Sequence, residues 1–288
     1  MAIFRAKLEK VNNKCTKDFL LPSRFAILLA LHYLCNLIKW DFVPTGIIMK
    51  TAIMSYTKQA EAEFCPKAVL FDMDGVLFNS MPAHAKAWSG AMRELGINFR
   101  EYDVYMNEGR TGHATINDLF QLQKGREATE EEKQRIYRRK SELFDAQGSP
   151  DAIPDIHEVL QVVQEAGWET YIVTGSGQPS LFERIERVFP HVFAPERMVT
   201  AFDVKIGKPD PEPYLKALQK AGLQPHEAMV VENAPLGVRS AKAAGIFTLA
   251  VNTGVLMPDE LKKEGADRVL NSMKELAEDL RYIKSMYR

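Results

Sequence analysis

Cysteine is scarce in this sequence, and the few cysteines are not spaced as metal ligands or disulfide partners usually are. Cys15, Cys35 and Cys65 are the only three in 288 residues. An odd and sparse set of this kind does not build a disulfide framework. The simplest interpretation is a protein of a reducing compartment, and we expect it to be cytoplasmic.

A surplus of one charge is also missing. The chain has 37 Lys and Arg against 38 Asp and Glu, which gives a formal net charge of -1. Proteins that bind nucleic acids usually carry a basic patch or stripe, so we expect no nucleic-acid partner. Hydrophobic residues make up 46% of the sequence. That fraction supports a sizeable core, and the length suits one or two domains.

No hydrophobic run is long enough to cross a bilayer as a helix. Residues 25–38 are mostly large and apolar, but a spanning helix needs about 20 such residues. No small-residue cleavage site follows this run, so a signal peptide is disfavoured. Either residues 1–65 are an extension outside the working protein, which would then start at Met49 or Met54, or the run is a membrane anchor. We expect the first, with no membrane partner.

From Lys67 onward, apolar segments alternate with segments of helical spacing. Strands are predicted at residues 67–71, 169–173, 198–200, 228–231, 247–251 and 268–270. Helices are predicted at residues 156–165, 180–188, 211–221 and 235–244. This alternation predicts an α/β fold whose core is a Rossmann-like parallel sheet covered by helices on both faces.

The first strand is followed by a helical stretch. Helices are predicted at residues 82–95, 115–123 and 129–144, the last beginning with a capping-box pattern at Thr129 and Glu132. No strong strand pattern lies between residues 82 and 148. We therefore divide the chain into an extension at 1–65, a catalytic core at 66–80 and 146–288, and an inserted helical cap at 81–145.

Polar residues stand where the predicted strands end. They are Asp72 and Asp74, Thr174 and Ser176, Glu232 and Asn233, with Lys208 in a nearby loop. Active sites of open parallel sheets lie beyond the carboxyl ends of the strands. Two carboxylates separated by one residue in an extended segment point to the same side, and a cation such as Mg²⁺ relieves their repulsion. One carboxylate can then attack phosphorus, while the other moves protons.

Each of these positions can also be explained without any catalytic role. Asp72 to Gly75 could be a helix-capping turn, and the loop at Thr174 and Ser176 an ordinary connection rather than a phosphate site. Lys208 could be solvated, and Glu232 with its neighbour could cap a helix. The four positions together favour magnesium-dependent phosphoryl transfer with Asp72, Asp74 and Lys208 as the catalytic residues.

In order, these positions match the four motifs of the haloacid dehalogenase superfamily. The resemblance runs from about Lys67 to the C-terminus and implies that superfamily's fold with an α-helical cap. Within it, His84 and Trp88 have the spacing of the β-phosphoglucomutase-like branch. The sequence most resembles the bacterial member of that branch identified as an inorganic pyrophosphatase, with which it shares residues 108–112, 199–205 and 232–238. Residues 1–65 have no counterpart.

The resemblance implies a role for each residue. Asp72 is the nucleophile and a metal ligand, and Asp74 is the acid and base with its carbonyl on the metal. The remaining roles are phosphate binding by Thr174 and Lys208, Mg²⁺ binding by Asn233, support behind the metal by Glu232, and cap contacts by Glu108, His84 and Lys140. Asn233 departs from the aspartate of many relatives, as does Asn79, and removes one negative charge from the metal site.

The sequence of the cap helps to predict which substrate the protein acts on. Mutases of the branch carry a cap arginine at the position of Gly112, and a lysine is common where this chain has Glu108. This difference favours hydrolysis of pyrophosphate to two phosphates, with Glu108 joining the Mg²⁺ ligands on cap closure and Arg110 as a phosphate clamp. The alternative is a β-phosphoglucomutase or a sugar-phosphate phosphatase. We expect a monomer acting on a small phosphorylated substrate.

Two further classes stay open. A dehalogenase also uses an aspartate nucleophile, but it does not need Asp74 for protonation of a leaving group. A binding module without activity would be expected to lose Asp72, Asp74 or Lys208, and all three are present.

Overall fold

The computed structural model describes residues 45–177 and 181–287, and its centre is a parallel β-sheet. The strand order is β3-β2-β1-β4-β5-β6, and every neighbouring pair is parallel. The strands are β1 (Ala68–Phe71), β2 (Glu169–Val173), β3 (Met198–Val199), β4 (Ala228–Glu232), β5 (Phe247–Val251) and β6 (Arg268–Leu270). Each lies where the sequence predicts a strand, and the predicted α/β fold class is confirmed.

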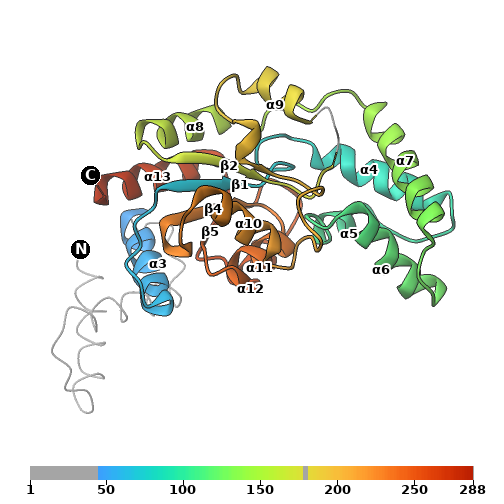
Figure 1. The fold of residues 1–288 in the computed structure, drawn as a ribbon, viewed down its shortest axis with the longest axis horizontal. Helices are drawn as coiled ribbons and strands as arrows, with labels where there is room; N and C mark the ends of the chain where they lie inside the picture. The colour runs from blue at the N-terminus through green and yellow to red at the C-terminus, as the bar shows by residue number, and fades with distance from the viewer. Residues whose placement is uncertain (1–44, 178–180, 288) are drawn as a thin grey trace, which may run out of the picture. The chain divides into compact units, whose positions relative to one another are not determined.

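Helices cover both faces of the sheet (Figure 1). Val69 and Phe71 of β1 face one hydrophobic cluster, whereas Ala68 and Leu70 face another. The first cluster includes residues of α3 (Thr45–Ala60), α8 (Ile156–Glu165), α9 (Leu181–Val188) and α13 (Met273–Met286). The second includes residues of α10 (Glu212–Ala221) and α11 (Pro235–Ala243). Because both faces are covered, the central strands are continuously apolar rather than alternating.

A separate group of helices follows β1. It comprises α4 (Met81–Arg93), α5 (Glu101–Met106), α6 (Gly112–Lys124) and α7 (Glu130–Asp145). These helices enclose a hydrophobic cluster of their own, which Leu256 joins from the loop after β5. They lie together at the right of Figure 1. The capping box at Thr129 and Glu132 is confirmed. The sequence did not predict α5 or the short helix α12 (Pro258–Lys263).

Helix α3 corrects the predicted boundary at residue 65. It lies within the range assigned to an extension, yet Met49, Ile53 and Tyr56 are buried in the cluster that covers the sheet. The Tyr56 hydroxyl also donates a hydrogen bond to the carbonyl oxygen of Gly245, at 2.9 Å. Residues 45–60 are therefore part of the packed core, and a chain starting at Met54 would lack two of its buried side chains. The apolar run at residues 25–38 lies outside the described residues.

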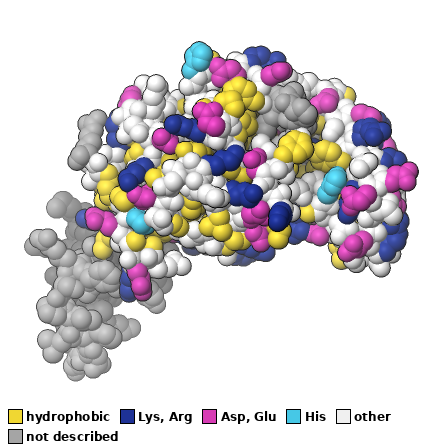
Figure 2. Space-filling view, in the orientation of Figure 1, with side chains coloured by type: hydrophobic (Ala, Val, Ile, Leu, Met, Phe, Trp, Pro, Cys, Tyr) yellow, Lys and Arg dark blue, Asp and Glu magenta, His cyan; other side chains and the backbone are white. Residues whose placement is uncertain are grey.

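The distribution of charged side chains on the surface is consistent with the near-zero net charge of the sequence. Basic and acidic side chains are interspersed on the face shown in Figure 2. Across residues 45–177 and 181–287, no helix combines the length and the apolar character that crossing a membrane requires.

Candidate active site

A cavity of about 80 Å³ lies between the loops that follow the strands and the helices α4–α7. The core contributes Asp72, Asp74, Thr174 and Ser176 to its lining. The helical unit contributes His84, Glu108, Arg110 and Lys140. The sequence predicts that these residues form one site, and they do line one cavity. Asp72 and Ser176 are 104 positions apart in the sequence.

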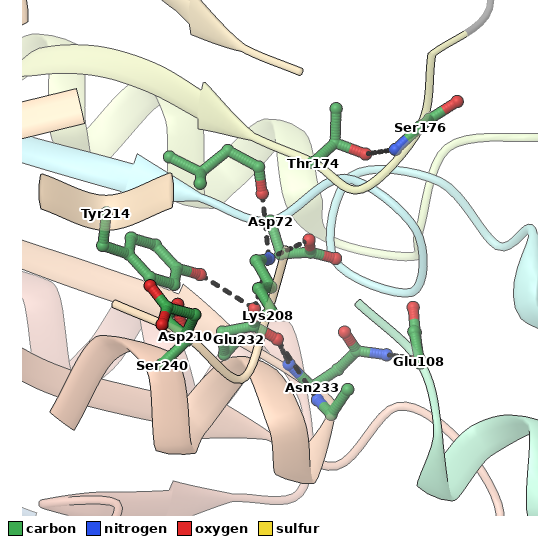
Figure 3. Close-up of polar contacts among 12 residues, drawn as sticks. Asp72, Glu108, Thr174, Ser176, Lys208, Asp210, Tyr214, Glu232, Asn233 and Ser240 are labelled. Atoms are coloured by element: carbon green, nitrogen blue, oxygen red, sulfur yellow. Dashed lines mark hydrogen bonds and ion pairs between the residues drawn. The ribbon is translucent and has the colours of Figure 1, made fainter. Parts of the chain in front are cut away.

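Lys208 lies behind this cavity and is almost fully buried, with 2% of its surface exposed. Its Nζ donates to Asp72 Oδ1 at 2.6 Å, to Glu232 Oε1 at 2.6 Å and to the carbonyl oxygen of Val173 at 2.9 Å (Figure 3). These three acceptors match the three donors of an ammonium group. Burial alone would lower the pKa of Lys208, but the attraction of the two carboxylates raises it above its ordinary value. The solvated-lysine interpretation is wrong.

Glu232 holds Lys208 in place. Its Oε1 also accepts a hydrogen bond from the Tyr214 hydroxyl at 2.8 Å, and its Oε2 accepts the N–H groups of Asn233 and Ala234 at 3.0 and 3.3 Å. Four donors therefore occupy this carboxylate, which leaves it a supporting role behind the site. The sequence missed Tyr214, because an aromatic residue within an apolar helix stripe gives no sign of a long-range polar contact.

Asp72 follows β1 and is buried. Burial raises the pKa of its carboxyl group to about 8, against the opposing effect of Lys208 and with a further contribution from Glu232. A positive charge near Asp72 would lower this pKa and favour the ionised, nucleophilic form.

Asp74 lies at the cavity surface and is held by two groups. Ser80 Oγ donates to its Oδ1 at 2.6 Å, and His84 Nε2 lies 3.2 Å from the same oxygen. Burial disfavours the charged carboxylate, but the contact with His84 and the hydrogen bond from Ser80 outweigh it, and the pKa of Asp74 lies below its ordinary value. The sequence missed Ser80, although a serine at the start of a helix is a common capping signal.

Two buried oxygen atoms beside these aspartates fit a cation. Glu108 Oε1 and Asn233 Oδ1 have no hydrogen-bond partner within the part of the chain that the structure describes. The other halves of the two side chains meet, since Asn233 Nδ2 donates to Glu108 Oε2 at 3.2 Å. Burial, followed by the charges of Asp72 and Asp74, raises the pKa of Glu108 well above its ordinary value. Oxygen donors of this kind are the ligands that Mg²⁺ and Ca²⁺ take.

Gly75 makes this arrangement possible. Its φ angle is +83°, in the left-handed region that glycine adopts without strain. A Cβ atom at this position would also overlap the side-chain amide of Asn233. The glycine therefore turns the chain after Asp74 and leaves room for the Asn233 side chain beside it.

Lys140 stands among aromatic rings on the helical side of the cavity. Its Nζ lies 5.5, 5.8 and 5.1 Å from the ring centres of Trp88, Tyr137 and Phe144, and only 3% of the residue is exposed. Burial lowers the pKa of Lys140 to about 8. Burial and the nearby Lys140 also lower the pKa of His84, whose ring stacks on Phe144.

The other residues predicted to bind phosphate are Arg110, Thr174 and Ser176, and each makes contacts within the protein. Arg110 lines the cavity, but its guanidinium group is paired with Asp118. Its Nε is buried without a hydrogen-bond partner among the described residues. The backbone N–H of Ser176 donates to Thr174 Oγ1 at 3.0 Å, which closes the loop after β2 into a compact turn.

The Tyr137 ring packs against Gly112, the position where the resemblance places a mutase arginine. A Cβ atom on Gly112 would overlap this ring, and both residues line the cavity, so a larger residue at 112 would require Tyr137 to move. The sequence indicated the missing arginine at Gly112 but did not show that Tyr137 fills the space.

Comparisons with known proteins agree on one family. The family model described as haloacid dehalogenase-like hydrolase matches residues 66–245. Hexitol phosphatase A of Escherichia coli is 33% identical over 73% of this chain and 93% of its own length. The 2-deoxyglucose-6-phosphate phosphatase 1 of Saccharomyces cerevisiae is 28% identical over 75% of this chain and 92% of its own length.

A solved structure from Bacteroides vulgatus, described as a candidate β-phosphoglucomutase, is 45% identical, with a TM-score of 0.81 over 84% of this chain and 98% of its own. The predicted resemblance to the β-phosphoglucomutase-like branch is confirmed. The narrower resemblance to an inorganic pyrophosphatase gains no support from these relatives.

Proposed function

Because the chain belongs to the haloacid dehalogenase-like hydrolase family, we propose that it is a magnesium-dependent phosphatase of small phosphorylated sugars or sugar alcohols. The observation that carries the proposal is the pair of aspartates at the cavity. Asp72 is fixed by Lys208, and Asp74 is fixed by Ser80 beside it. The names of the two phosphatases above support the substrate class.

Asp72 is the proposed nucleophile. Its carboxylate would attack phosphorus, the bond to the leaving oxygen would break, and an aspartyl-phosphate would form. Lys208 holds one oxygen of Asp72 and keeps a positive charge beside the phosphoryl group. Water would then attack the same phosphorus and release phosphate and the free carboxylate.

Asp74 is the proposed acid and base. In the first step, the phosphate dianion of the substrate raises the pKa of Asp74 and favours the protonated form, which can donate to the leaving oxygen. This donation leaves Asp74 ionised, the form that its lowered pKa favours, and the carboxylate can then take a proton from the water that attacks the aspartyl-phosphate. The hydrogen bond from Ser80 fixes the carboxylate in the position from which both transfers occur.

The proposed cation ligands are Asp72, Asp74, Asn233 and Glu108. When bound there, Mg²⁺ would neutralise charge on the phosphoryl oxygens. We propose that residues 81–145 act as a cap over this site, as the contributions of His84, Glu108 and Lys140 to the cavity suggest. Close contact between the helical unit and the core supports this role, because a Cβ atom on Gly175 would lie 2.8 Å from the carbonyl oxygen of Gly109.

Hydrolysis is favoured over a mutase reaction by the pair Gly112 and Tyr137. A mutase must hold a bisphosphate at both ends, and the resemblance places the cationic group for the distal phosphate at Gly112. The Tyr137 ring occupies that space instead, and Arg110, two residues away, is engaged by Asp118.

Pyrophosphate remains a second candidate substrate because of Glu108. A buried carboxylate with an unpartnered oxygen repels a phosphate anion unless a cation lies between them. Pyrophosphate carries Mg²⁺ in solution and is small, so it would bring that cation to Glu108 without needing sugar contacts.

Release of phosphate from a defined substrate panel tests both candidates. The panel contains hexitol phosphates, 2-deoxyglucose 6-phosphate, β-glucose 1-phosphate and pyrophosphate, each with and without Mg²⁺. We expect at least one sugar or hexitol phosphate to exceed pyrophosphate about tenfold in kcat/KM. A preference for pyrophosphate that Glu108→Gln selectively removes would replace the first candidate with the second. Faster conversion of β-glucose 1-phosphate to glucose 6-phosphate than any hydrolysis would identify a mutase.

A further inference from the structure

Three side chains of different chemistry meet at the edge of the sheet where strands begin. Cys65 precedes β1, and His226 and Glu227 precede β4. One thiol, imidazole or carboxylate donor atom from each lies within 4.8 Å of the other two. We propose that these residues form a second metal site, for a divalent transition metal of the Zn²⁺ class, which is independent of the cavity.

The backbone holds the donors in register. The N–H of Cys65 donates to the carbonyl oxygen of His226 at 3.0 Å, and the N–H of Lys67 donates to that of Glu227 at 2.7 Å. These bonds extend the parallel pairing of β1 with β4, in which Ala68 lies opposite Ala228. The donors therefore stand on a rigid part of the fold, although their segments are about 160 positions apart in the sequence.

The site is remote from the catalytic centre. Cys65 stands before β1 and Asp72 after it, so the two lie at opposite edges of the sheet. Seven residues of extended chain span roughly 20 Å. Metal bound at Cys65 therefore has no direct contact with the proposed Mg²⁺ ligands.

The donor set selects the class of metal. Thiolate and imidazole bind Zn²⁺ and similar ions, whereas Mg²⁺ takes oxygen donors. Three protein ligands would leave the fourth tetrahedral position to water, as in open zinc sites. Ligand atoms around tetrahedral zinc are roughly 3.3–3.8 Å apart, given bond lengths of about 2.0–2.3 Å. The three residues are each partly exposed, so their side chains can rotate by the remaining distance.

Lys67 competes for this site. Its Nζ lies 2.5 Å from Glu227 Oε1, while Glu227 Oε2 accepts the N–H of Gln224 at 2.8 Å. The Lys67 side chain is 60% exposed, and an exposed ion pair of this kind contributes little to stability. A divalent ion can therefore displace the ammonium group from Glu227. Removal of the Lys67 side chain should therefore strengthen metal binding. If the thiol of Cys65 bound the metal without Glu227, the same substitution would have no effect.

Titration with Co²⁺ tests the site, because cobalt bound to a thiolate absorbs by charge transfer in the near ultraviolet. The full chain carries Cys15→Ser and Cys35→Ser, so that Cys65 is its one thiol. We expect one equivalent of Co²⁺ to bind with this band and to be displaced by Zn²⁺. Cys65→Ser should abolish the band, and His226→Gln or Glu227→Gln should weaken binding at least about tenfold.

Two variants serve as controls. Lys67→Gln should bind Co²⁺ more tightly than the parent. His191→Gln alters another exposed His–Glu pair, with Glu186, and should leave the titration unchanged. Absence of the band from the folded parent would overturn the proposal. Unchanged affinity in His226→Gln, or no gain in Lys67→Gln, would also overturn it, because the metal would then not be held by this set.

Discussion

Substitution of Ile53 by alanine measures whether helix α3 belongs to the folded protein. Ile53 is 4% exposed and lies in the cluster that covers the sheet. Removing a buried isoleucine side chain down to alanine costs about 2–5 kcal/mol of unfolding free energy. At about 2–4 °C per kcal/mol for a protein of this size, the midpoint of thermal unfolding should fall by roughly 4–20 °C. A chain that begins at Met54 also loses Met49 and should lose more.

The assay is thermal and urea unfolding of the full chain followed by circular dichroism. Ile47→Ala is the matched control, because Ile47 lies in the same helix with 46% of its surface exposed. Exposed substitutions usually change the free energy by less than about 0.5 kcal/mol. If Ile53→Ala unfolds within that margin of Ile47→Ala, or if the chain starting at Met54 is as stable as the full chain, the packing argument is refuted and residues 45–60 are dispensable.

Four further predictions concern the catalytic site. Asp72→Asn should lower kcat at least about 10⁴-fold, or roughly 5.5 kcal/mol, with unchanged circular dichroism; activity within tenfold of the parent would contradict a nucleophilic role. Mg²⁺ should activate and Ca²⁺ inhibit, since Ca²⁺ takes a larger and looser set of ligands; full activity in excess EDTA would exclude the metal. KM should rise with pH through about 8, where Lys140 loses its positive charge, and Lys140→Arg should flatten that profile. Tyr214→Phe removes one hydrogen bond to Glu232 and should cost about 1.5–3 kcal/mol of unfolding free energy; no loss would show that the bond is dispensable.

The strands, and the order of strands and helices along the chain, could be predicted because their signals are local. Each strand is an apolar run bounded by polar or glycine residues, and parallel pairing follows from the alternation with helices. Helix α3 also carried a signal, since Met49, Ile53 and Tyr56 recur at helical spacing. The absence of a matching segment in the resembling family led to its assignment as an extension. Helix α5 has only six residues, too few for a clear periodicity.

The residues of the site also fall into those that could be predicted from the sequence and those that could not. Asp72 and Lys208 could be proposed because residue type and position at a strand end or in an adjoining loop suffice to suggest phosphoryl transfer. Tyr137 and Tyr214 were missed because each acts through a contact with another segment of the chain. Ser80 was also missed, although it contacts Asp74 only six residues away. A serine or tyrosine is common at such positions, so its identity alone does not distinguish a polar network from ordinary packing.

The electrostatics of the cavity explain why the carboxyl group of Asp72, the proposed nucleophile, has a raised pKa. The carboxylates of Asp72, Asp74 and Glu108 line the cavity and Glu232 lies behind it, whereas Lys140 and Lys208 carry positive charge close to them. The raised pKa values of Asp72 and Glu108 are the direct result of that imbalance together with burial. A cation bound beside these carboxylates would offset part of their negative charge, so we expect Mg²⁺ to lower the pKa values of Asp72 and Glu108.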